Sequence, residues 1–327
     1  MLKISLLIYE DVVLSCVSGV LDILMGANQF LEQSGKPPAF QVDLVSEKIK
    51  NIQLSVPAQF ICYKTLEDVT ATDLILAPAF YGSPDVVLSK NQALVEWIKE
   101  MRAQGTEVGS LCLGSYFLAE AGVLAGKSCT SHWMAIADMR NRYPEIKVLS
   151  DIVMTDEDGV YTSGGAFSSL NLVLYLIEKF CGREVEIWAS KMFSIDMDRV
   201  NQAYFAVFQG QRQHEDEEIL KAQTYIEKHY HLQISIEEIA GQTSMSKRSF
   251  IRRFKSATKN TPLEYLQRVK IESAKKELEK STENISSLMY NVGYNDVKTF
   301  RQVFKRITGL TPQDYRKKYS RVAIPQE

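Results

Sequence analysis

The sequence predicts two domains: an α/β domain with a parallel sheet sandwiched by helices, then an all-α domain with two helix-turn-helix motifs. Three observations support this prediction. The first half alternates apolar, strand-like runs with helical spacing, and the second half has helical spacing only from Ile219 onward. A block near the C-terminus also repeats at a fixed offset of 50 residues. The 327 residues are enough to build two hydrophobic cores.

The first half reads as alternating strands and helices. Apolar, branched runs predict strands at 3–9, 40–46, 73–78 and 107–112, and amphipathic spacing predicts helices at 17–31, 91–104 and 114–121. A further strand at 127–131, a helix around 133–143, a strand pair at 152–155 and 160–163, and a helix at 170–181 follow. Near-continuous apolar strands alternating with helices are typical of a parallel sheet that is covered on both faces.

Charge separates the two halves. The run QRQHEDEE at 211–218 predicts an exposed linker or a helix start between domains at 1–210 and 219–327. Residues 212–327 carry 22 Lys and Arg against 15 Asp and Glu, a net charge of +7, whereas residues 1–211 carry 16 against 25, a net charge of −9. A basic C-terminal half suits a polyanionic partner.

The repeat predicts one structural unit used twice. Each copy is a short apolar helix, a tight turn and a second helix with basic residues on one side, which is the pattern of a helix-turn-helix. The residues identical at the offset of 50 are Phe250/Phe300, Phe254/Phe304, Lys255/Lys305, Thr258/Thr308, Thr261/Thr311, Pro262/Pro312 and Tyr265/Tyr315.

Two outward helix faces are the candidate DNA contacts. Arg grips guanine edges with two hydrogen bonds, Gln does so for adenine, and Lys holds phosphates. The alternative for any one of these residues is an ordinary solvated helix face. The outward residues are Lys247, Arg248, Ile251, Arg252 and Lys255 in the first copy and Val297, Lys298, Arg301, Gln302 and Lys305 in the second.

These residues resemble a known family. Residues 245–262 and 293–315, including GYNDVKTFRQVFKRITGLTPQDYR, are similar to the tandem helix-turn-helix domain of AraC/XylS-type regulators. The resemblance implies two recognition helices in successive major grooves, about 10 bp apart. It places base-reading positions at Arg248, Ile251 and Arg252 in one motif and Val297, Lys298, Arg301 and Gln302 in the other, with Ile251 against a thymine methyl.

The second informative motif is SLCLGSYFLAEAGVL at 110–124. Cys112 stands between an expected strand and an expected helix, and the small residues Ser110 and Gly114 permit the strained turn that lifts a nucleophile above a sheet. A helix N-terminus also favours a thiolate. The alternative is a buried, inert cysteine, and the local pattern leaves both open.

The first half resembles the PfpI/ThiJ-like, class I glutamine-amidotransferase fold, with a flavodoxin-like sheet. CTSHW (129–133) and VYTSGG (160–165) are similar to the branch that carries AraC-type domains, the GlxA-like regulators. The resemblance implies a ligand-sensing domain derived from an enzyme. Several acid/base positions depart from the catalytic relatives, which favours a residual pocket over an active enzyme. The pocket candidates are Cys112, Cys16 in place of an Asp, Asp22 in place of a Glu, Leu113 in place of a His, and His132.

The resulting hypothesis is a cytoplasmic transcriptional regulator that binds double-stranded promoter DNA and an unknown small-molecule effector. We expect a homodimer through the N-terminal domain, RNA polymerase as a further partner, and no membrane contact. Five scattered cysteines without metal spacing suit a reduced compartment, and no metal or cofactor motif is visible. The alternatives are a PfpI/ThiJ-type enzyme, with Cys112 as nucleophile assisted by Asp22 or His132, and a sensor that responds to Cys112 oxidation.

Overall fold

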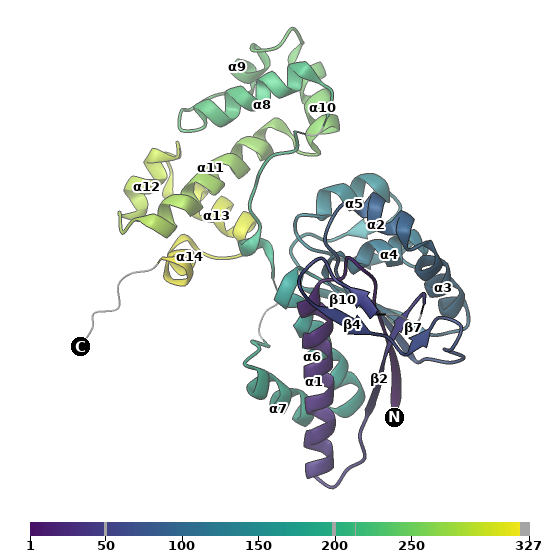
Figure 1. The fold of residues 1–327 in the computed structure, drawn as a ribbon. Helices are drawn as coiled ribbons and strands as arrows, with labels where there is room; N and C mark the ends of the chain where they lie inside the picture. The colour runs from purple at the N-terminus through teal and green to yellow at the C-terminus, as the bar shows by residue number, and fades with distance from the viewer. Residues whose placement is uncertain (49–50, 198–200, 213, 321–327) are drawn as a thin grey trace, which may run out of the picture. The chain divides into compact units, whose positions relative to one another are not determined.

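The computed structural model describes residues 1–48, 51–197, 201–212 and 214–320 (Figure 1). The chain forms two compact units, Met1–Gln202 and Ala203–Glu327. The sequence placed the end of the first domain at residue 210. The boundary falls earlier because residues 203–210 belong to the helical unit, where Phe208 packs against apolar side chains and the Ala206 carbonyl accepts a hydrogen bond from Lys275.

The expected linker at 211–218 is part of the helical unit as well. The Gln211 carbonyl accepts a hydrogen bond from Gln223, and the Asp216 side chain caps the first helix of the unit by accepting from the Ile219 N–H. Residue 213 lies outside the described residues. The charged run is therefore a helix start held by side-chain contacts, because a run rich in Asp and Glu suits a helix N-terminus.

A seven-stranded sheet forms the centre of the first unit. Its order is β10-β11-β7-β6-β1-β2-β5, and every neighbouring pair is parallel except β10 with β11. Two small ladders, β3-β4 and β8-β9, stand apart from it. The strands are β1 (Leu2–Leu7), β2 (Phe40–Ser46), β3 (Asn51–Gln53), β4 (Gln59–Ile61), β5 (Lys64–Thr65), β6 (Leu74–Ala77), β7 (Glu107–Ser110), β8 (Ser128–Cys129), β9 (Lys147–Val148), β10 (Met154–Glu157) and β11 (Val160–Ser163).

Helices form two groups around this sheet: α1 packs with α6 and α7, and α2 packs with α3 and α4 (Figure 1). Because the sheet is covered, all four residues of β6 are buried, as near-continuous apolar strands require. The helices are α1 (Leu14–Gln33), α2 (Pro84–Lys90), α3 (Gln92–Ala103), α4 (Ser115–Glu120), α5 (Ile136–Arg142), α6 (Ser169–Cys181) and α7 (Arg183–Phe193), with short 3₁₀ turns η1 (Cys112–Gly114) and η2 (Ala166–Ser168).

The strand order reverses beside β1. The chain passes from β1 to β2 on one side of β1 and then returns to β6 on its other side. Open α/β sheets bind ligands beyond the carboxyl ends of their strands at such a switch point. Tyr9 follows β1, Pro78 follows β6 and Cys112 follows β7, so these three residues come from that edge of the sheet.

The mixed α/β architecture expected from the sequence is confirmed, with some missed elements. The ladder β3-β4, the strand β5 and the helices α2 and α7 were not predicted, and the helix expected around 133–143 begins only at Ile136. Strands of two or three residues carry too little periodicity to be seen in a sequence.

Of the described helices, α1 is long and apolar enough by length and composition to cross a bilayer. Seven of its residues, including Val17, Val20 and Leu24, are instead buried in the core of the first unit. This is how the core helix of an α/β domain is expected to pack.

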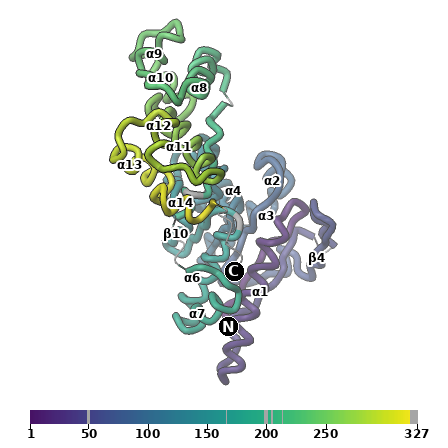
Figure 2. The backbone as a smooth tube through the Cα atoms, turned by 90° about the vertical axis from the view of Figure 1, so that its left-hand side faces the viewer, coloured from purple at the N-terminus to yellow at the C-terminus, as the bar shows by residue number. Residues whose placement is uncertain are grey.

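Among its described residues, the second unit consists of helices joined by loops and turns and contains no strand. The long helix α11 runs between α9 and α10 at one end and α12, α13 and α14 at the other, as both views show (Figures 1 and 2). Its elements are η3 (Ala203–Phe205), α8 (Glu217–His229), α9 (Ile236–Ala240), α10 (Lys247–Thr258), α11 (Pro262–Lys280), α12 (Ile285–Asn291), α13 (Val297–Thr308) and α14 (Pro312–Tyr319).

Two separate hydrophobic cores stabilise this unit, and α11 contributes to both. Tyr265 and Leu266 belong to the first core, around Phe250 and Phe254. Ile271, Ala274 and Leu278 belong to the second core, around Phe300 and Phe304. The two motifs are thus separate packing units on one shared helix.

The sequence repeat is reproduced contact by contact. The Phe254 and Tyr265 rings meet edge to face at 5.3 Å, and the equivalent Phe304 and Tyr315 rings at 5.6 Å. The Tyr265 hydroxyl donates to Glu227 at 2.6 Å, and the Tyr315 hydroxyl to Glu279 at 2.7 Å. Equal contacts in both copies mean that the two motifs share one three-dimensional plan.

Candidate functional site

The first helix-turn-helix is built by local capping. Ser235 and Glu238 form a capping box at the start of α9, and the Ser246 side chain accepts from the Ser249 N–H at the start of α10. Phe250 and Phe254 are fully buried, which turns the opposite face of α10 to solvent. The exposed residues on that face are Lys247, Arg248, Arg252 and Lys255.

The sequence-predicted contacts of the first motif are not equivalent. The side chains of Arg248 and Arg252 make no hydrogen bond or ion pair to another described residue. Lys247 pairs with Glu237 of α9, and this hydrogen bond holds the pKa of the Glu237 carboxyl below its usual value. Ile251 is half-buried against the first core. Arg248 and Arg252 therefore have the greatest freedom to reach a ligand.

The second motif has the same arrangement. Gly293 makes the turn with φ of +79°, where an L side chain would be strained, and Asp296 caps α13 by accepting from the Thr299 N–H at 2.6 Å. Lys298, Arg301 and Gln302 are exposed on α13. Val297 is half-buried against the second core, like Ile251 against the first. Two exposed polar faces thus stand at equivalent places on the two motifs.

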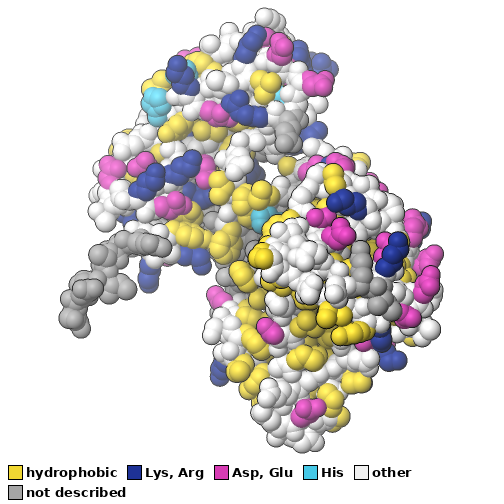
Figure 3. All heavy atoms as spheres, in the orientation of Figure 1, with side chains coloured by type: hydrophobic (Ala, Val, Ile, Leu, Met, Phe, Trp, Pro, Cys, Tyr) yellow, Lys and Arg dark blue, Asp and Glu magenta, His cyan; other side chains and the backbone are white. Residues whose placement is uncertain are grey.

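Charge on the helical unit is mixed. On the face that Figure 3 shows, Lys and Arg side chains lie among Asp and Glu side chains, in keeping with the 22 basic and 15 acidic residues at 212–327. Arg253, on α10, is held by two hydrogen bonds to Asp216 at 2.8 and 2.9 Å. Some of the basic residues are therefore structural, and only part of the basic excess lies on the exposed faces of α10 and α13.

In the first unit, Cys112 occupies a strained turn between β7 and α4. Its φ is +58°, in the left-handed region that residues other than glycine rarely adopt. The turn needs glycine two residues later, because a Cβ on Gly114 would lie 1.9 Å from the Ala77 carbonyl oxygen. Ser115 and Ser131 both donate to the Cys112 carbonyl at 3.2 Å. The geometry is that of a nucleophile elbow, although Cys112 is only 5% exposed.

Tyr9 and Cys16 lie close to this turn. The Tyr9 hydroxyl donates to the Pro78 carbonyl at 2.6 Å, and burial, together with the nearby Cys16, Asp11 and Cys112, raises the pKa of Tyr9 well above its usual value. Burial also raises the pKa of the Cys16 thiol, against hydrogen bonds to Ala79 and Ser169. Cys16 is therefore a protonated thiol at neutral pH and does not supply the carboxylate that the family resemblance leads us to expect there.

The other sequence-predicted pocket residues have different surroundings. Asp22 is exposed on α1, and its side chain makes no hydrogen bond or ion pair to another described residue. Leu113 is half-buried against the core. The His132 ring packs against Gly165, its Nδ1 accepts from the Met134 N–H at 3.1 Å, and burial lowers its pKa. His132 is thus neutral at pH 7, and the structure gathers Cys112 and Cys16, but not Asp22, around Tyr9.

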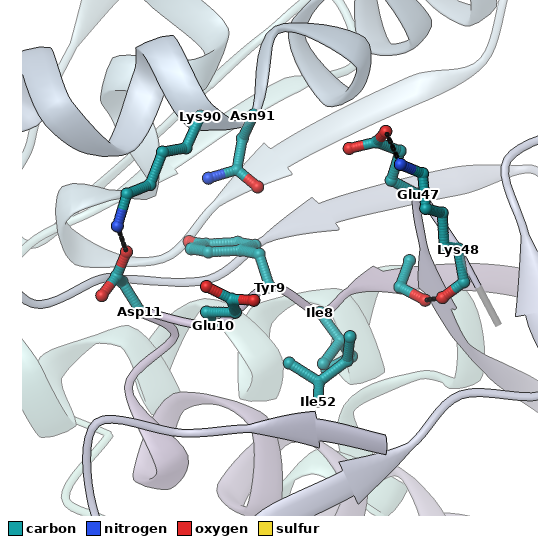
Figure 4. Close-up of a pocket in the computed structure, with 10 residues that line it drawn as sticks. Ile8, Tyr9, Glu10, Asp11, Glu47, Lys48, Ile52, Lys90 and Asn91 are labelled. Atoms are coloured by element: carbon teal, nitrogen blue, oxygen red, sulfur yellow. Dashed lines mark hydrogen bonds and ion pairs between the residues drawn. The ribbon is translucent and has the colours of Figure 1, made fainter. Parts of the chain in front are cut away.

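A cavity of about 350 Å³, lined in part by Tyr9, lies at the carboxyl ends of β1 and β2 (Figure 4). Two ion pairs lie on its walls: Lys90 with Asp11 at 3.8 Å, and the neighbouring residues Lys48 and Glu47 at 3.5 Å. Tyr9 lines this cavity and also lies near Cys112. It was missed in the sequence because it directly follows a strand and reads as part of that strand. The lining residues are Ile8, Tyr9, Glu10, Asp11, Ser46, Glu47, Lys48, Ile52, Lys90 and Asn91.

Within the described ranges, no three His, Cys, Asp or Glu side chains are placed to hold a metal ion together.

Two protein-family models match the chain. The DJ-1/PfpI family model matches residues 24–179, and the helix-turn-helix domain model matches residues 239–318. The first match covers the strands and helices around Cys112, and the second covers both motifs.

Curated relatives include regulators and an enzyme. The HTH-type transcriptional regulator GbdR of Pseudomonas aeruginosa is 25% identical over 72% of this chain and 64% of its own length, so the chain spans slightly less than two thirds of that relative. The isonitrile hydratase of Pseudomonas putida is 28% identical over 55% of this chain and 73% of the enzyme.

The fold also matches solved structures. An AraC family transcriptional regulator from Pseudomonas putida superimposes with a TM-score of 0.52 at 18% identity, covering 59% of this chain and 100% of its own. At this identity the match concerns the fold alone.

Proposed function

Because the chain joins a domain of the DJ-1/PfpI family to a helix-turn-helix domain of the AraC type, we propose that it is a transcriptional regulator that binds double-stranded promoter DNA. One observation supports this most strongly. The two motifs repeat the same internal contacts, and both present exposed polar side chains on the second helix, α10 and α13. Two equivalent exposed helices on one unit suit two successive major grooves.

The proposed contacts divide by chemistry. Arg248, Arg252, Lys298, Arg301 and Gln302 have the donors that read base edges, and their exposure leaves them available. Lys247 pairs with Glu237 in the free chain. On binding DNA it leaves Glu237 and contacts a phosphate instead. Ile251 and Val297 reach apolar base groups from half-buried positions. RNA polymerase is a further proposed partner at the promoter.

We propose that the first unit senses a small molecule and forms the homodimer. The candidate pocket lies around Cys112, Cys16 and Tyr9, where the strand order reverses, with Leu113, His132 and Asp22 as outer residues. An effector changes transcription only if it binds two arrangements of the chain with different affinities. We propose a cytoplasmic location, which suits a chromosomal DNA target, and α1 packs as a core helix of this unit.

The second candidate is an enzyme, which the elbow at Cys112 and the isonitrile hydratase relative favour. The acid/base groups argue against it. The buried Cys16 thiol has a raised pKa, and Asp22 is exposed. We therefore expect a site that binds without turnover. Purified chain should not hydrate isonitriles, and Cys16→Asp should create measurable activity. Turnover by the parent with kcat/KM on the order of 10⁴ M⁻¹s⁻¹ would instead establish the enzyme.

A selection experiment tests the regulator directly. The full chain is mixed with a library of random double-stranded DNA, and bound sequences are enriched over several rounds. We expect one enriched site with two half-sites about 10 bp apart. Enrichment of no common sequence would overturn the proposal.

A further inference from the structure

Lys270, in the middle of α11, is a buried lysine that the proposed DNA contacts do not use. Its side chain is only 7% exposed, and burial lowers its pKa. Lysine is almost never buried without partners, because a desolvated ammonium is costly. Its partners therefore indicate what it does.

Those partners belong to different motifs. The Lys270 Nζ donates to the Gly293 carbonyl at 2.7 Å, in the turn of the second motif, and to the Leu232 carbonyl at 3.4 Å, in the loop between α8 and α9 of the first. It also lies 5.2 Å from the centre of the Tyr294 ring. One ammonium group, with three donors, thus bonds to the backbone of both motifs.

The two motifs touch at this same point. A Cβ on Gly293 would lie 2.6 Å from the His231 carbonyl oxygen and 2.8 Å from the Lys270 Nζ. The loop of the first motif and the turn of the second are therefore in direct backbone contact around the ammonium. Along α11, Leu266 belongs to the first core and Ala274 to the second, and Lys270 stands midway between them.

We propose that Lys270 is a positioning residue that fixes the separation of the two recognition helices, so that the protein discriminates between DNA sites whose half-sites differ in spacing by one base pair. The inference rests on the proposed function. One base pair moves a half-site by about 3.4 Å along the duplex and by about 35° around it, given 10–10.5 bp per turn. A rigid pair of motifs cannot follow both displacements, whereas a loosened pair can.

The test uses the full chain and the site that it selects from random DNA. Dissociation constants are measured for the selected site and for sites with one base pair inserted or removed between the half-sites. The wild type should bind the altered sites at least about 10-fold more weakly, as for a mismatched base pair. We call the dissociation constant of an altered site divided by that of the selected site the spacing ratio. Lys270→Met should reduce the spacing ratio to about 3-fold or less, because the hydrogen bonds to both loops are lost.

Lys275→Met is the matched control. Lys275 is another lysine on α11 and is 4% exposed, but it bonds to Glu272 and to the Ala206 carbonyl and not to both motifs. Its removal should lower the melting temperature and leave the spacing ratio near that of the wild type. The comparison separates loss of stability from loss of positioning.

If Lys270→Met does not fold, Gly293→Ala carries the test, because its Cβ pushes against the His231 carbonyl while the ammonium remains. It should shift the preferred spacing or flatten the ratio. The inference is overturned if Lys270→Met folds and keeps the spacing ratio and the preferred spacing of the wild type. Where Lys270→Met does not fold, the same result for Gly293→Ala overturns it. Either outcome leaves the proposed function intact. A wild type that selects no site with two half-sites overturns both.

Discussion

At the scale of single residues, Arg252 and Arg301 are the strongest candidates for base contacts. Both are exposed, on α10 and α13 respectively, and neither side chain has a hydrogen-bond or ion-pair partner among the described residues. A bidentate contact to guanine contributes roughly 1–3 kcal/mol of discrimination. In the proposed two-groove complex, the equivalent helices α10 and α13 would put these two contacts in different grooves.

Arg252→Ala should therefore weaken binding by about 1–3 kcal/mol and relax base preference in one half-site, and Arg301→Ala should do so about one turn away. Binding of each variant to a set of single-base variants of the selected site measures this. Arg253→Ala is the control, because Asp216 holds that guanidinium, and its base preference should not change. Loss of base preference at the same base pairs in Arg252→Ala and Arg301→Ala would contradict the two-groove account.

Cys112 offers a second prediction at this scale. Burial raises the pKa of Cys16, Cys62, Cys181 and Cys129, the last to about 12. Their thiolate fractions are small at pH 7.5, and the thiolate is the reactive form. Cys112, at the amino end of a helix, should be alkylated first by a limiting reagent, as mass spectrometry can map. Faster labelling of any other cysteine in the folded chain, with equal labelling in denaturant, would contradict the assignment.

Some residues were predictable from the sequence, and others were not. Ser235, Ser246 and Asp296 precede helical runs, and each is a cap in the structure because capping is a local interaction. The burial of Lys270 was missed because a lysine in a sequence is normally expected to be exposed to solvent. The available signal was its place in the row Leu266, Lys270, Ala274 and Leu278, where its neighbours at four-residue intervals are buried. Tyr9 and the exposure of Asp22 depend on how strands and helices assemble, which local pattern does not encode.

At the scale of elements, each motif depends on its own small core. Phe254 and Phe304 are fully buried, and each meets a tyrosine ring edge to face. The repeat was predictable because the same core residues recur at one offset, while the short ladders and α7 had no comparable signal. The shared helix α11 then joins two cores that are otherwise separate.

Phe254→Ala and Phe304→Ala should each destabilise the helical unit by roughly 3–5 kcal/mol, because each leaves a cavity in a small core. Ser235→Ala, which removes half of an exposed capping box, should cost about 1 kcal/mol. Denaturant unfolding of the helical unit measures the order. A larger loss for Ser235→Ala than for either Phe variant would mean that the cores are wrongly placed.

At the scale of the whole molecule, the two parts of the chain differ in net charge. Basic excess falls on residues 212–327, and acidic excess on residues 1–211. DNA affinity should therefore reside in residues 203–327 alone. The isolated unit should lose on the order of 10³-fold in affinity or more between 50 and 200 mM salt, since phosphate contacts release counterions. Gel-shift titration at several salt concentrations measures this, and salt-independent or absent binding would contradict it.

The most direct test of the central claim is a hydroxyl-radical footprint of the full chain on its selected DNA site. Two recognition helices on one shared helix predict two protected segments on the same face of the duplex, about 10 bp apart. Arg252→Ala should weaken one segment and Arg301→Ala the other. A single protected segment, or two that weaken together in either variant, would contradict the proposed reading of DNA by the two motifs.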